Sequence, residues 1–243
     1  MHLDRLSSLL AHFEVRAQRM PTYKDSNLFI FGNAEKNQLH KLILYVDAAP
    51  VSSESTAALV YARVDMGGTQ NPLLQIMPKT VEIELNKDDP VKTVANLIAL
   101  EASMSRCGGQ FALDRLCDLL VVNILRNRLE SNQTEPGIFA GLAHPKLRHV
   151  VVAIHDDPGR PWKVDDFVEL AGMSRSQFMA TFQRTLGKSP MAYLKLWRMT
   201  AARNSLLKGG RVKEVARRFG YGSGDAFCRA FVATYGRPPT QLV

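Results

Sequence analysis

Histidine and cysteine are the side chains of this sequence best suited to metal binding or nucleophilic chemistry, and their spacing indicates no such site. They are scattered along the chain, at His2, His12, His40, His144, His149, His155, Cys107, Cys117 and Cys228. Metal sites need ligands at short, regular spacings. The sequence also lacks a Ser/His/Asp set, a phosphate-binding loop and a dinucleotide-binding glycine motif. We therefore expect a protein that is not an enzyme, with no catalytic site, no metal and no cofactor.

The basic side chains are concentrated in one part of the chain. The formal net charge of the 243 residues is +8. Residues 144–243 hold 17 Lys and Arg against 7 Asp and Glu, whereas residues 1–143 hold 14 against 16. This asymmetry indicates a polyanionic partner for the basic part, with a membrane surface as the alternative. No apolar run is long enough to span a bilayer and no cleavable signal pattern is present, so we expect a cytoplasmic protein without membrane contact.

The basic part contains one structural unit twice. Serine, phenylalanine, phenylalanine, glycine and proline follow one another at steps of 4, 4, 5 and 3 residues from Ser174 to Pro190, and again from Ser223 to Pro239. The two copies are offset by 49 residues. Self-similarity at a fixed offset indicates that one supersecondary unit is used twice.

Each copy has the pattern of a helix, a glycine turn and a second helix. Gly172 and Gly220 permit the left-handed backbone of a tight turn, and Ser174 and Ser223 can cap the helix that follows. This is the pattern of a helix-turn-helix unit, whose second helix enters the major groove of DNA. A purely structural helical bundle is the alternative.

A long helix is predicted between the two units, over residues 190–207. Its sequence, PMAYLKLWRMTAARNSLL, has proline at a favourable first position and no internal glycine, and Gly209-Gly210 follows it. A helix of this length spans about 27 Å. It could therefore place two recognition helices about one DNA turn, ~34 Å, apart.

These motifs together resemble the DNA-binding domain of AraC/XylS-type transcription regulators, over residues 144–243. The resemblance is carried by Ala171-Gly172-Met173-Ser174, Phe182, Gly187-Lys188-Ser189-Pro190, Tyr193-Leu194, Trp197-Arg198-Met199, Ala216, Gly220-Tyr221-Gly222-Ser223, Ala226-Phe227, Arg229-Ala230-Phe231 and Pro238-Pro239. It implies a sequence-specific transcription regulator, such as an activator, that binds double-stranded promoter DNA. RNA polymerase is a further partner that this function allows.

The exposed faces of the two predicted recognition helices supply the candidate DNA contacts. The candidates are Arg175, Ser176, Gln177, Met179, Ala180, Arg184, Lys188, Ser223, Gly224, Asp225, Ala226, Cys228 and Arg229. The resemblance places Ser176, Met179 and Ala180 at base-facing positions. Phosphates, which position the protein without specifying sequence, suit the basic residues Arg175, Arg184, Lys188, Arg217 and Arg218. Arg229 is the strongest candidate, because its planar fork suits guanine or a phosphate. For each residue the alternative is an ordinary solvated side chain.

Short apolar or alternating runs in the first half predict an antiparallel sheet, over residues 28–31, 42–46, 58–62 and 81–85. This half resembles the cupin-like sensor domain found ahead of some AraC-type domains. The resemblance is carried by Tyr61-Ala62-Arg63-Val64-Asp65, Asn71-Pro72-Leu73-Leu74, Met77-Pro78, Leu113-Asp114-Arg115-Leu116-Cys117-Asp118-Leu119-Leu120-Val121-Val122 and Leu125-Arg126. It implies a β domain followed by helices that can dimerise. Only about 65 residues carry strand signals, which is short for an eight-stranded jelly roll.

Two helices are predicted after these strands. The first begins at Asp89-Pro90, with the aspartate as its cap, and the second covers about residues 110–130. The second helix is apolar on more than one face, so it must be buried on more than one face. A homodimer partner would cover the extra face; burial against the sheet and the preceding helix is the alternative.

The expected fold class is α+β. A shortened cupin-like antiparallel β domain with dimerisation helices covers residues 1–131, a linker covers 132–143, and an all-α double helix-turn-helix domain covers 144–243. Short helices are also expected over 3–13 and 144–155. A small-molecule effector bound to the first domain would make the regulator ligand-controlled. In the rival interpretation that domain only dimerises or binds a protein partner. A cupin-type enzyme fused to a DNA-binding domain is a distant third interpretation.

Overall fold

The computed structural model describes residues 6–7, 9–10, 16–33, 38–46, 57–65, 78–86, 89–104, 106–130 and 136–242. These residues fall into two compact units. One holds the described residues between 16 and 130, and the other holds 136–242 together with the described residues of the N-terminal segment. Most of the helix expected over 3–13 lies outside the described residues, although Ser7, Leu9 and Leu10 are helical.

The first unit is built on a five-stranded antiparallel sheet. Its strands are β1 (Arg16–Met20), β2 (Leu28–Asn33), β3 (Gln38–Tyr45), β4 (Val60–Asp65) and β5 (Thr80–Glu84), in the spatial order β1-β4-β2-β3-β5. All four strands expected from the sequence are present. Strand β1 was not expected, because its sequence RAQRM has no alternation of apolar and polar residues.

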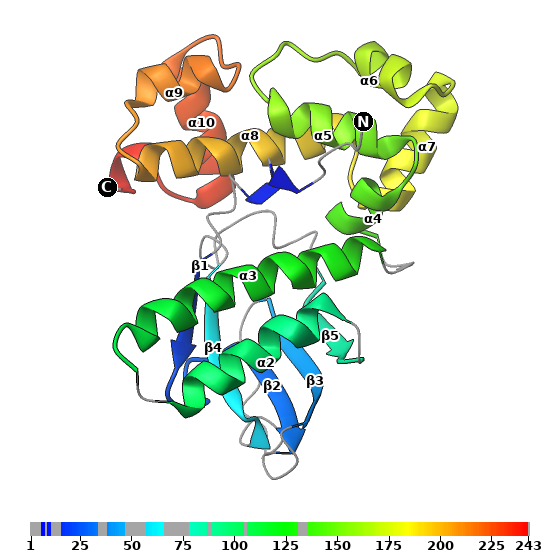
Figure 1. The fold of residues 1–243 in the computed structure, drawn as a ribbon. Helices are drawn as coiled ribbons and strands as arrows, with labels where there is room; N and C mark the ends of the chain where they lie inside the picture. The colour runs from blue at the N-terminus through cyan, green and yellow to red at the C-terminus, as the bar shows by residue number, and fades with distance from the viewer. Residues whose placement is uncertain are drawn as a thin grey trace. The chain divides into compact units, whose positions relative to one another are not determined.

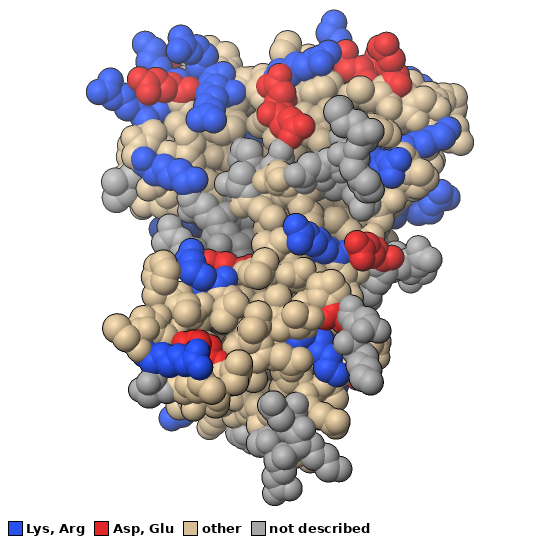
Figure 2. All heavy atoms as spheres, in the orientation of Figure 1, with Lys and Arg blue, Asp and Glu red and all other residues tan. Residues whose placement is uncertain are grey.

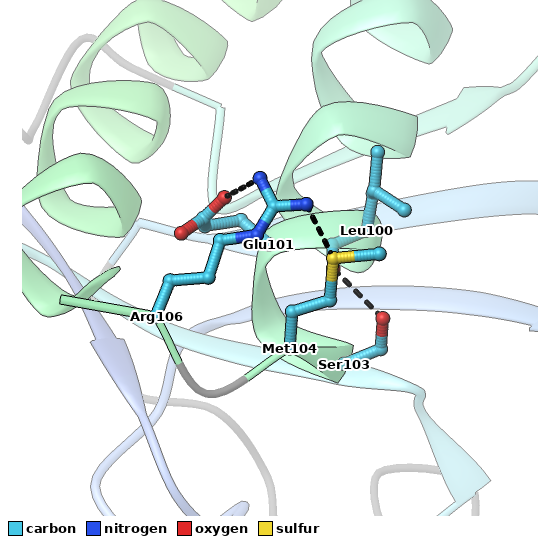
Figure 3. A network of polar contacts seen from close by, with 5 residues as sticks. All are labelled: Leu100, Glu101, Ser103, Met104 and Arg106. Carbon is cyan, nitrogen blue, oxygen red and sulfur yellow. Dashed lines mark hydrogen bonds and ion pairs between the residues drawn. The ribbon is translucent and has the colours of Figure 1, made fainter. Parts of the chain in front are cut away.

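Two helices follow the sheet and pack against each other. Helix α2 (Pro90–Ser103) begins as predicted, because the Asp89 carboxylate accepts a hydrogen bond from the backbone N–H of Val91 at 2.7 Å. Helix α3 (Gly109–Glu130) covers the whole of the second predicted helix. Arg106 holds the end of α2 before the chain enters α3: its guanidinium lies 3.7 Å from the Glu101 carboxylate and 2.6 Å from the Met104 sulfur (Figure 3).

The sheet has two buried faces, because side chains alternate along each strand. Leu28, Ile30 and Leu42 lie on one face. The other face carries an aromatic cluster, which we call the Phe29 cluster; its described members are Phe29, Phe31, Ile43 and Ala58, with Tyr23, Tyr45 and Tyr61 packed against them. Neither α2 nor α3 contributes to the Phe29 cluster, so these helices cover the opposite face, and Figure 1 shows both lying across the sheet.

Strand β1 is held at the edge of the sheet by helix α3. The backbone N–H groups of Ala17 and Arg19 donate to the carboxylates of Asp118 and Asp114, at 2.9 and 3.3 Å. An edge strand otherwise presents unpaired backbone groups, so these carboxylates take the place of a further strand. Cys117 lies between them in the sequence and is buried. Burial, followed by the charges of the two carboxylates, raises the pKa of Cys117 to about 12.

The second unit is all-helical in its described residues. Its helices are α4 (Ile138–Ala143), α5 (Leu147–Asp156), α6 (Val164–Ala171), α7 (Arg175–Leu186), α8 (Pro190–Leu207), α9 (Val212–Arg218) and α10 (Gly224–Tyr235), followed by the 3-10 helix η3 (Pro239–Gln241). The elements predicted from the repeated unit, α6 to α10, are all present. Residues 138–143, which the sequence assigned to the linker, instead form α4, because their apolar side chains pack against α5 and α7.

Helix α5 starts later than the sequence predicts, and its predicted first residue serves as a cap. The Nδ1 atom of His144 accepts hydrogen bonds from the backbone N–H groups of Lys146 and Leu147, at 3.2 and 3.1 Å. Burial, then the nearby charges of Arg184 and Lys146, lowers the pKa of His144. The neutral imidazole can therefore act as the acceptor that the helix start requires.

Two aromatic cores form on either side of helix α8. In the first, Trp197 stacks on His155 with ring centroids 3.5 Å apart, and the Tyr193 hydroxyl lies 2.7 Å from His155 Nε2. The second core is built from Met199, Ala201, Ala202, Leu206, Val215, Ala216, Phe219, Phe227, Phe231 and Tyr235. Helix α8 contributes side chains to both cores, so it joins the two halves of the second unit through packing as well as through the chain.

Replacing Asn27 tests a buried side chain that continues the ladder between β2 and β4. Its Nδ2 donates to the carbonyl of Val64 at 2.9 Å, and its Oδ1 accepts from the N–H of Val64 at 2.7 Å. Asn27→Ala removes both hydrogen bonds and leaves the backbone N–H and carbonyl of Val64 without these partners. We therefore expect the free energy of unfolding of the first unit to fall by about 2 kcal/mol in urea denaturation. Gln18→Ala, at an exposed position of β1, should change it by less than about 0.5 kcal/mol. An equal loss in both variants would contradict this role for Asn27.

Candidate nucleic-acid interface

The first helix-turn-helix unit is formed by α6 and α7. Gly172 ends α6 with φ 56°, a left-handed conformation that a side chain would strain. Ser174 then caps α7, its hydroxyl accepting from the backbone N–H of Gln177 at 3.4 Å. Phe178, Phe182 and Leu186 are buried on the inner face of α7. The outer face is exposed and carries Arg175, Ser176, Gln177, Met179, Ala180, Gln183 and Arg184.

One predicted phosphate contact is already engaged within the protein. The guanidinium of Arg175 forms an ion pair with the carboxylate of Asp165, which lies in the first turn of α6. Both side chains are largely exposed, so this pair adds little stability. Its consequence is positional, because it turns the first basic side chain of α7 back toward α6.

The second helix-turn-helix unit repeats this geometry with α9 and α10. Gly220 follows α9 with φ 77°, and the hydroxyl of Ser223 accepts from the backbone N–H of Ala226 at 3.1 Å. Phe227 and Phe231 face inward and are fully buried. Of the predicted contacts, Asp225 and Arg229 are exposed one turn apart, and Gly224, Ala226 and Cys228 are half-buried beside them.

Arg229 is available for an external contact. No residue in the described part of the chain forms a hydrogen bond or an ion pair with its guanidinium, and the side chain is exposed. Arg184 of α7 is likewise exposed, whereas Lys188 lies just beyond the end of α7 and is half-buried. The predicted candidates therefore divide between two helices, with Lys188 at the margin of the first.

A hollow with a volume of about 380 Å³ lies between α9 and the first turn of α10. Lys213 and Arg217 line it from α9, and Gly222, Ser223 and Gly224 line it from the start of α10. A helix N-terminus presents unpaired N–H groups and a positive dipole end, which favour an anion. Figure 2 shows basic side chains gathered over α9 on the face that it draws.

Helix α8 connects the two helix-turn-helix units, and Figure 1 shows it running from the side of α7 to the side of α9 and α10. Its start is fixed by Ser189, whose hydroxyl accepts from the backbone N–H of Ala192, and by Pro190 at the first position. Both helix-turn-helix units thus begin their second helix with a serine cap and are followed by a proline-led segment.

Comparison with known proteins shows that both the helical part and the sheet-containing part of the chain match known families. A helix-turn-helix domain family matches residues 167–243, which begin within α6 and continue through α7, α9 and α10. A cupin family matches residues 32–130, which contain the end of β2, the strands β3 to β5 and both α2 and α3. An AraC-like transcription regulator of Streptomyces lividans is 31% identical over 174 residues, which cover 70% of this chain and 57% of that protein. The chain belongs to the AraC-like regulators.

Two further relatives of this AraC-like chain differ in how far they extend. An HTH-type transcriptional regulator of Haemophilus influenzae is 32% identical over 166 residues, covering 68% of this chain and 55% of that protein. The regulator AlkR of Acinetobacter baylyi is 26% identical over 235 residues, covering 94% of this chain and 74% of that protein. The chain spans little more than half the length of the first two of these three relatives.

Sequence reasoning missed three features of this AraC-type domain. It did not include Lys213 among the candidate DNA contacts, because the hollow that Lys213 lines forms only when α9 and α10 pack. It treated Arg175 as free although Asp165 holds it. It also gave no role to Arg198, which bonds to the segment before α6. In all three cases the deciding partner lies on another element.

The described ranges also bear on the classes of protein considered at the start. Within them, no helix has both the length and the apolar character needed to cross a membrane. No three His, Cys, Asp or Glu side chains of those ranges come together as metal ligands.

Releasing Arg175 from Asp165 should strengthen the attraction of this surface for DNA. We expect Asp165→Asn to raise affinity for any duplex and to steepen the dependence of log K on log salt by about one unit, because one more cation becomes available to phosphates. Fluorescence anisotropy at a series of salt concentrations measures both quantities.

The matched control is Glu169→Gln, which removes the same charge from an exposed position of α6. It should raise affinity less than Asp165→Asn and leave the salt slope nearly unchanged. Identical slopes for the two variants would show that Arg175 already reaches phosphate in the presence of Asp165.

Proposed function

We propose that this chain is a sequence-specific transcription regulator that reads two adjacent major-groove segments of promoter DNA with α7 and α10. The proposal rests on one observation: two equivalent serine-capped helices bury two phenylalanines each and turn their other face outward, on one compact unit rich in Lys and Arg. Such helices are the reading elements of helix-turn-helix proteins. A regulator of this kind acts in the cytoplasm and changes the access or activity of RNA polymerase.

The outward faces suggest how sequence is read. On α10, Arg229 suits the paired acceptors of guanine, and Asp225 one turn earlier can accept from the amino group of cytosine. On α7, Ser176 can bond to a base edge, and the exposed side chains of Met179 and Ala180 suit the methyl group of thymine. The two helices therefore offer different chemistry, so the two DNA segments would differ in sequence.

The hollow beside α10 suggests how the protein is held on the duplex. A phosphate seated there would face the N–H groups at the start of α10 and the cationic side chains of Lys213 and Arg217. Contacts of this type fix the register of the recognition helix without specifying sequence. Arg184 and Lys188 would serve the same purpose near α7.

The test begins with duplexes selected by the full chain from a random DNA pool. Anisotropy at two salt concentrations then compares the selected duplex with a scrambled one. We expect the selected duplex to bind at least about tenfold more tightly. We expect Arg229→Ala to weaken binding to the selected duplex by about 1–3 kcal/mol and to relax the preference at one base position.

Arg217→Ala is the matched control, because it removes the same side chain from the hollow. It should weaken binding to both duplexes by a similar factor and lower the salt slope by about one. If the selected and scrambled duplexes bind the unmodified chain equally, the proposed function is wrong. If Arg229→Ala behaves as Arg217→Ala does, Arg229 contacts the backbone instead.

We further propose that the chain forms a homodimer through α2 and α3. Each helix exposes large apolar side chains: Leu97 and Leu100 on α2, with Met104 just after its end, and Phe111 and Leu119 on α3. Phe111 is 73% exposed, and the guanidinium of Arg115 lies over its ring at 5.8 Å. Large exposed apolar side chains grouped on neighbouring helices are typical of protein interfaces, and two copies would present four helix-turn-helix units to DNA.

Leu119→Glu places a charge on this surface. Sedimentation velocity should show a dimer for the unmodified chain and a dimer dissociation constant raised at least about tenfold for the variant. Gln18→Glu adds the same charge at an exposed position of β1 and should leave the dimer intact. A monomeric unmodified chain, or an equally dimeric variant, would contradict the proposal.

A ligand-controlled regulator remains the second candidate, and the Phe29 cluster is the observation that favours it. The ring of Phe29 meets Tyr45 and Tyr61 edge to face, with centroids 5.9 and 6.1 Å apart. Such a surface would suit a small apolar effector that also accepts a hydrogen bond from a phenol. A compound that binds there raises the melting temperature of the chain, whereas a domain that only dimerises gives no such shift with any small molecule.

A further inference from the structure

Arg198 lies on helix α8 and does not face the solvent as a free cation. Its Nε donates to the carbonyl of Pro158 at 2.7 Å, and its Nη2 donates to the carbonyl of Arg160 at 2.8 Å. Both carbonyls belong to the segment that connects α5 to α6. The guanidinium therefore fastens the entry of the first helix-turn-helix unit to the connecting helix, with the two-pronged geometry that only arginine offers.

The same place is also a close approach to the second helix-turn-helix unit. A Cβ at Gly220 would lie 2.7 Å from the carbonyl oxygen of Gly159 and 2.9 Å from Arg198 Nη2. A Cβ at Gly159 would collide with the backbone carbonyl oxygen of Arg218, the last residue of α9. Two glycines thus allow the backbone before α6 and the backbone after α9 to meet directly.

From this point, contacts lead into both helix-turn-helix units. Tyr221 directly follows Gly220, which approaches Arg198, and the Tyr221 ring packs edge to face on Phe227 of α10 at 5.4 Å. On the other side, Arg160 lies over the ring of Trp162 at 4.2 Å, and Trp162 packs on Phe167 of α6 at 5.2 Å. This contact therefore links the two cores through side chains and loop backbone, in addition to the backbone of α8.

We propose that this contact, the Arg198 brace, sets the relative rotation of α7 and α10 and thereby the spacing of the two DNA segments that the chain reads. The brace consists of Pro158, Gly159, Arg160, Arg198 and Gly220. The inference rests on the proposed function, because spacing matters only if both helices bind DNA. Arg198 is a positioning residue: it touches no base, and it acts through the two units that it joins.

The brace adds a connection to the packing of α9 and α10 against α8, and it bears on how the second helix-turn-helix unit follows α8 along the chain. The chain leaves α8 through Lys208, Gly209 and Gly210, and Gly209 has φ 86°. A glycine pair has wide conformational freedom and fixes the direction of α9 poorly. The brace and the second core together oppose the rotation that this short link would allow. One inserted base pair rotates DNA by about 35°, so a fixed pair of helices should tolerate little change in spacing.

The first measurement needs no DNA. Spin labels at Gln183→Cys on α7 and Ala233→Cys on α10, both exposed positions, report the distance between the units by pulsed electron resonance. The full chain carries Cys107→Ser and Cys228→Ser, while the buried Cys117 is left in place because its raised pKa keeps it unreactive. We expect a narrow distance distribution without further change and a broader one with Arg198→Ala.

Two further variants distinguish loss of the brace from a general loss of structure. Gly159→Ala forces the same backbones apart while leaving the arginine in place, so it should broaden the distribution as Arg198→Ala does. Lys195→Ala removes one positive charge from an exposed position of α8 and should leave the distribution narrow. Circular dichroism confirms that the helices persist in each variant. An unchanged distribution in folded Arg198→Ala would overturn the proposal.

The second measurement uses the duplex selected by the unmodified chain. It compares this duplex with derivatives in which one or two base pairs are inserted between the two DNA segments that α7 and α10 read. The unmodified chain and Lys195→Ala should lose at least about tenfold in affinity on insertion, because one helix then misses its bases. Arg198→Ala should lose about threefold or less, because a looser pair of units can follow the displaced segment. Equal losses for Arg198→Ala and the unmodified chain would overturn the role in spacing.

The two measurements fail in distinguishable ways. If the distance distribution broadens but the unmodified chain does not prefer the selected duplex, the proposed function fails and the mechanical role of the brace stands. If the unmodified chain prefers that duplex but the distribution does not respond to Arg198→Ala, the function stands and the brace is overturned.

Discussion

The packing of two aromatic cores against one helix is the constraint on which the second unit depends. Helix α8 places Tyr193 and Trp197 in the first core and Met199 and Leu206 in the second. A helix that is buried on most of its sides cannot shift without opening the contacts on each of them. Burial also raises the pKa of Tyr193 well above its ordinary value, so its hydroxyl stays protonated 2.7 Å from His155 Nε2. The recognition helices are therefore presented by the interior of the unit, not by loops.

The parts of the fold that could be predicted from the sequence are those decided by local backbone needs. The serine of each repeated unit caps a helix, and the glycine after its second phenylalanine ends that helix in the left-handed region, at Gly187 with φ 73° and at Gly236 with φ 71°. Asp89 and Pro90 likewise mark the start of α2, as its N-cap and its first residue. Each of these signals is short, strong and independent of the rest of the chain.

The parts that could not be predicted depend on partners far away in the sequence. Strand β1 exists because β4 and two carboxylates of α3 pair with it, although its own residues show no strand pattern. Among the arginines, Arg175, Arg198 and Arg229 look alike in the sequence. The structure gives the first a carboxylate, the second two carbonyls and the third no partner among the described residues. Such differences arise only from tertiary packing, which a local pattern does not contain.

The close approach of Gly159 and Gly220 has a consequence for how such a domain can change over time. The repeated units look like interchangeable modules that could be traded between related proteins to combine two reading specificities. Yet the backbone before the first unit and the turn of the second are shaped to each other, and each needs glycine where they meet. A recombined domain would inherit two surfaces that had never been matched. Any exchange must therefore include the α5–α6 segment together with the α9–α10 turn. The two helix-turn-helix units are thus expected to be inherited together.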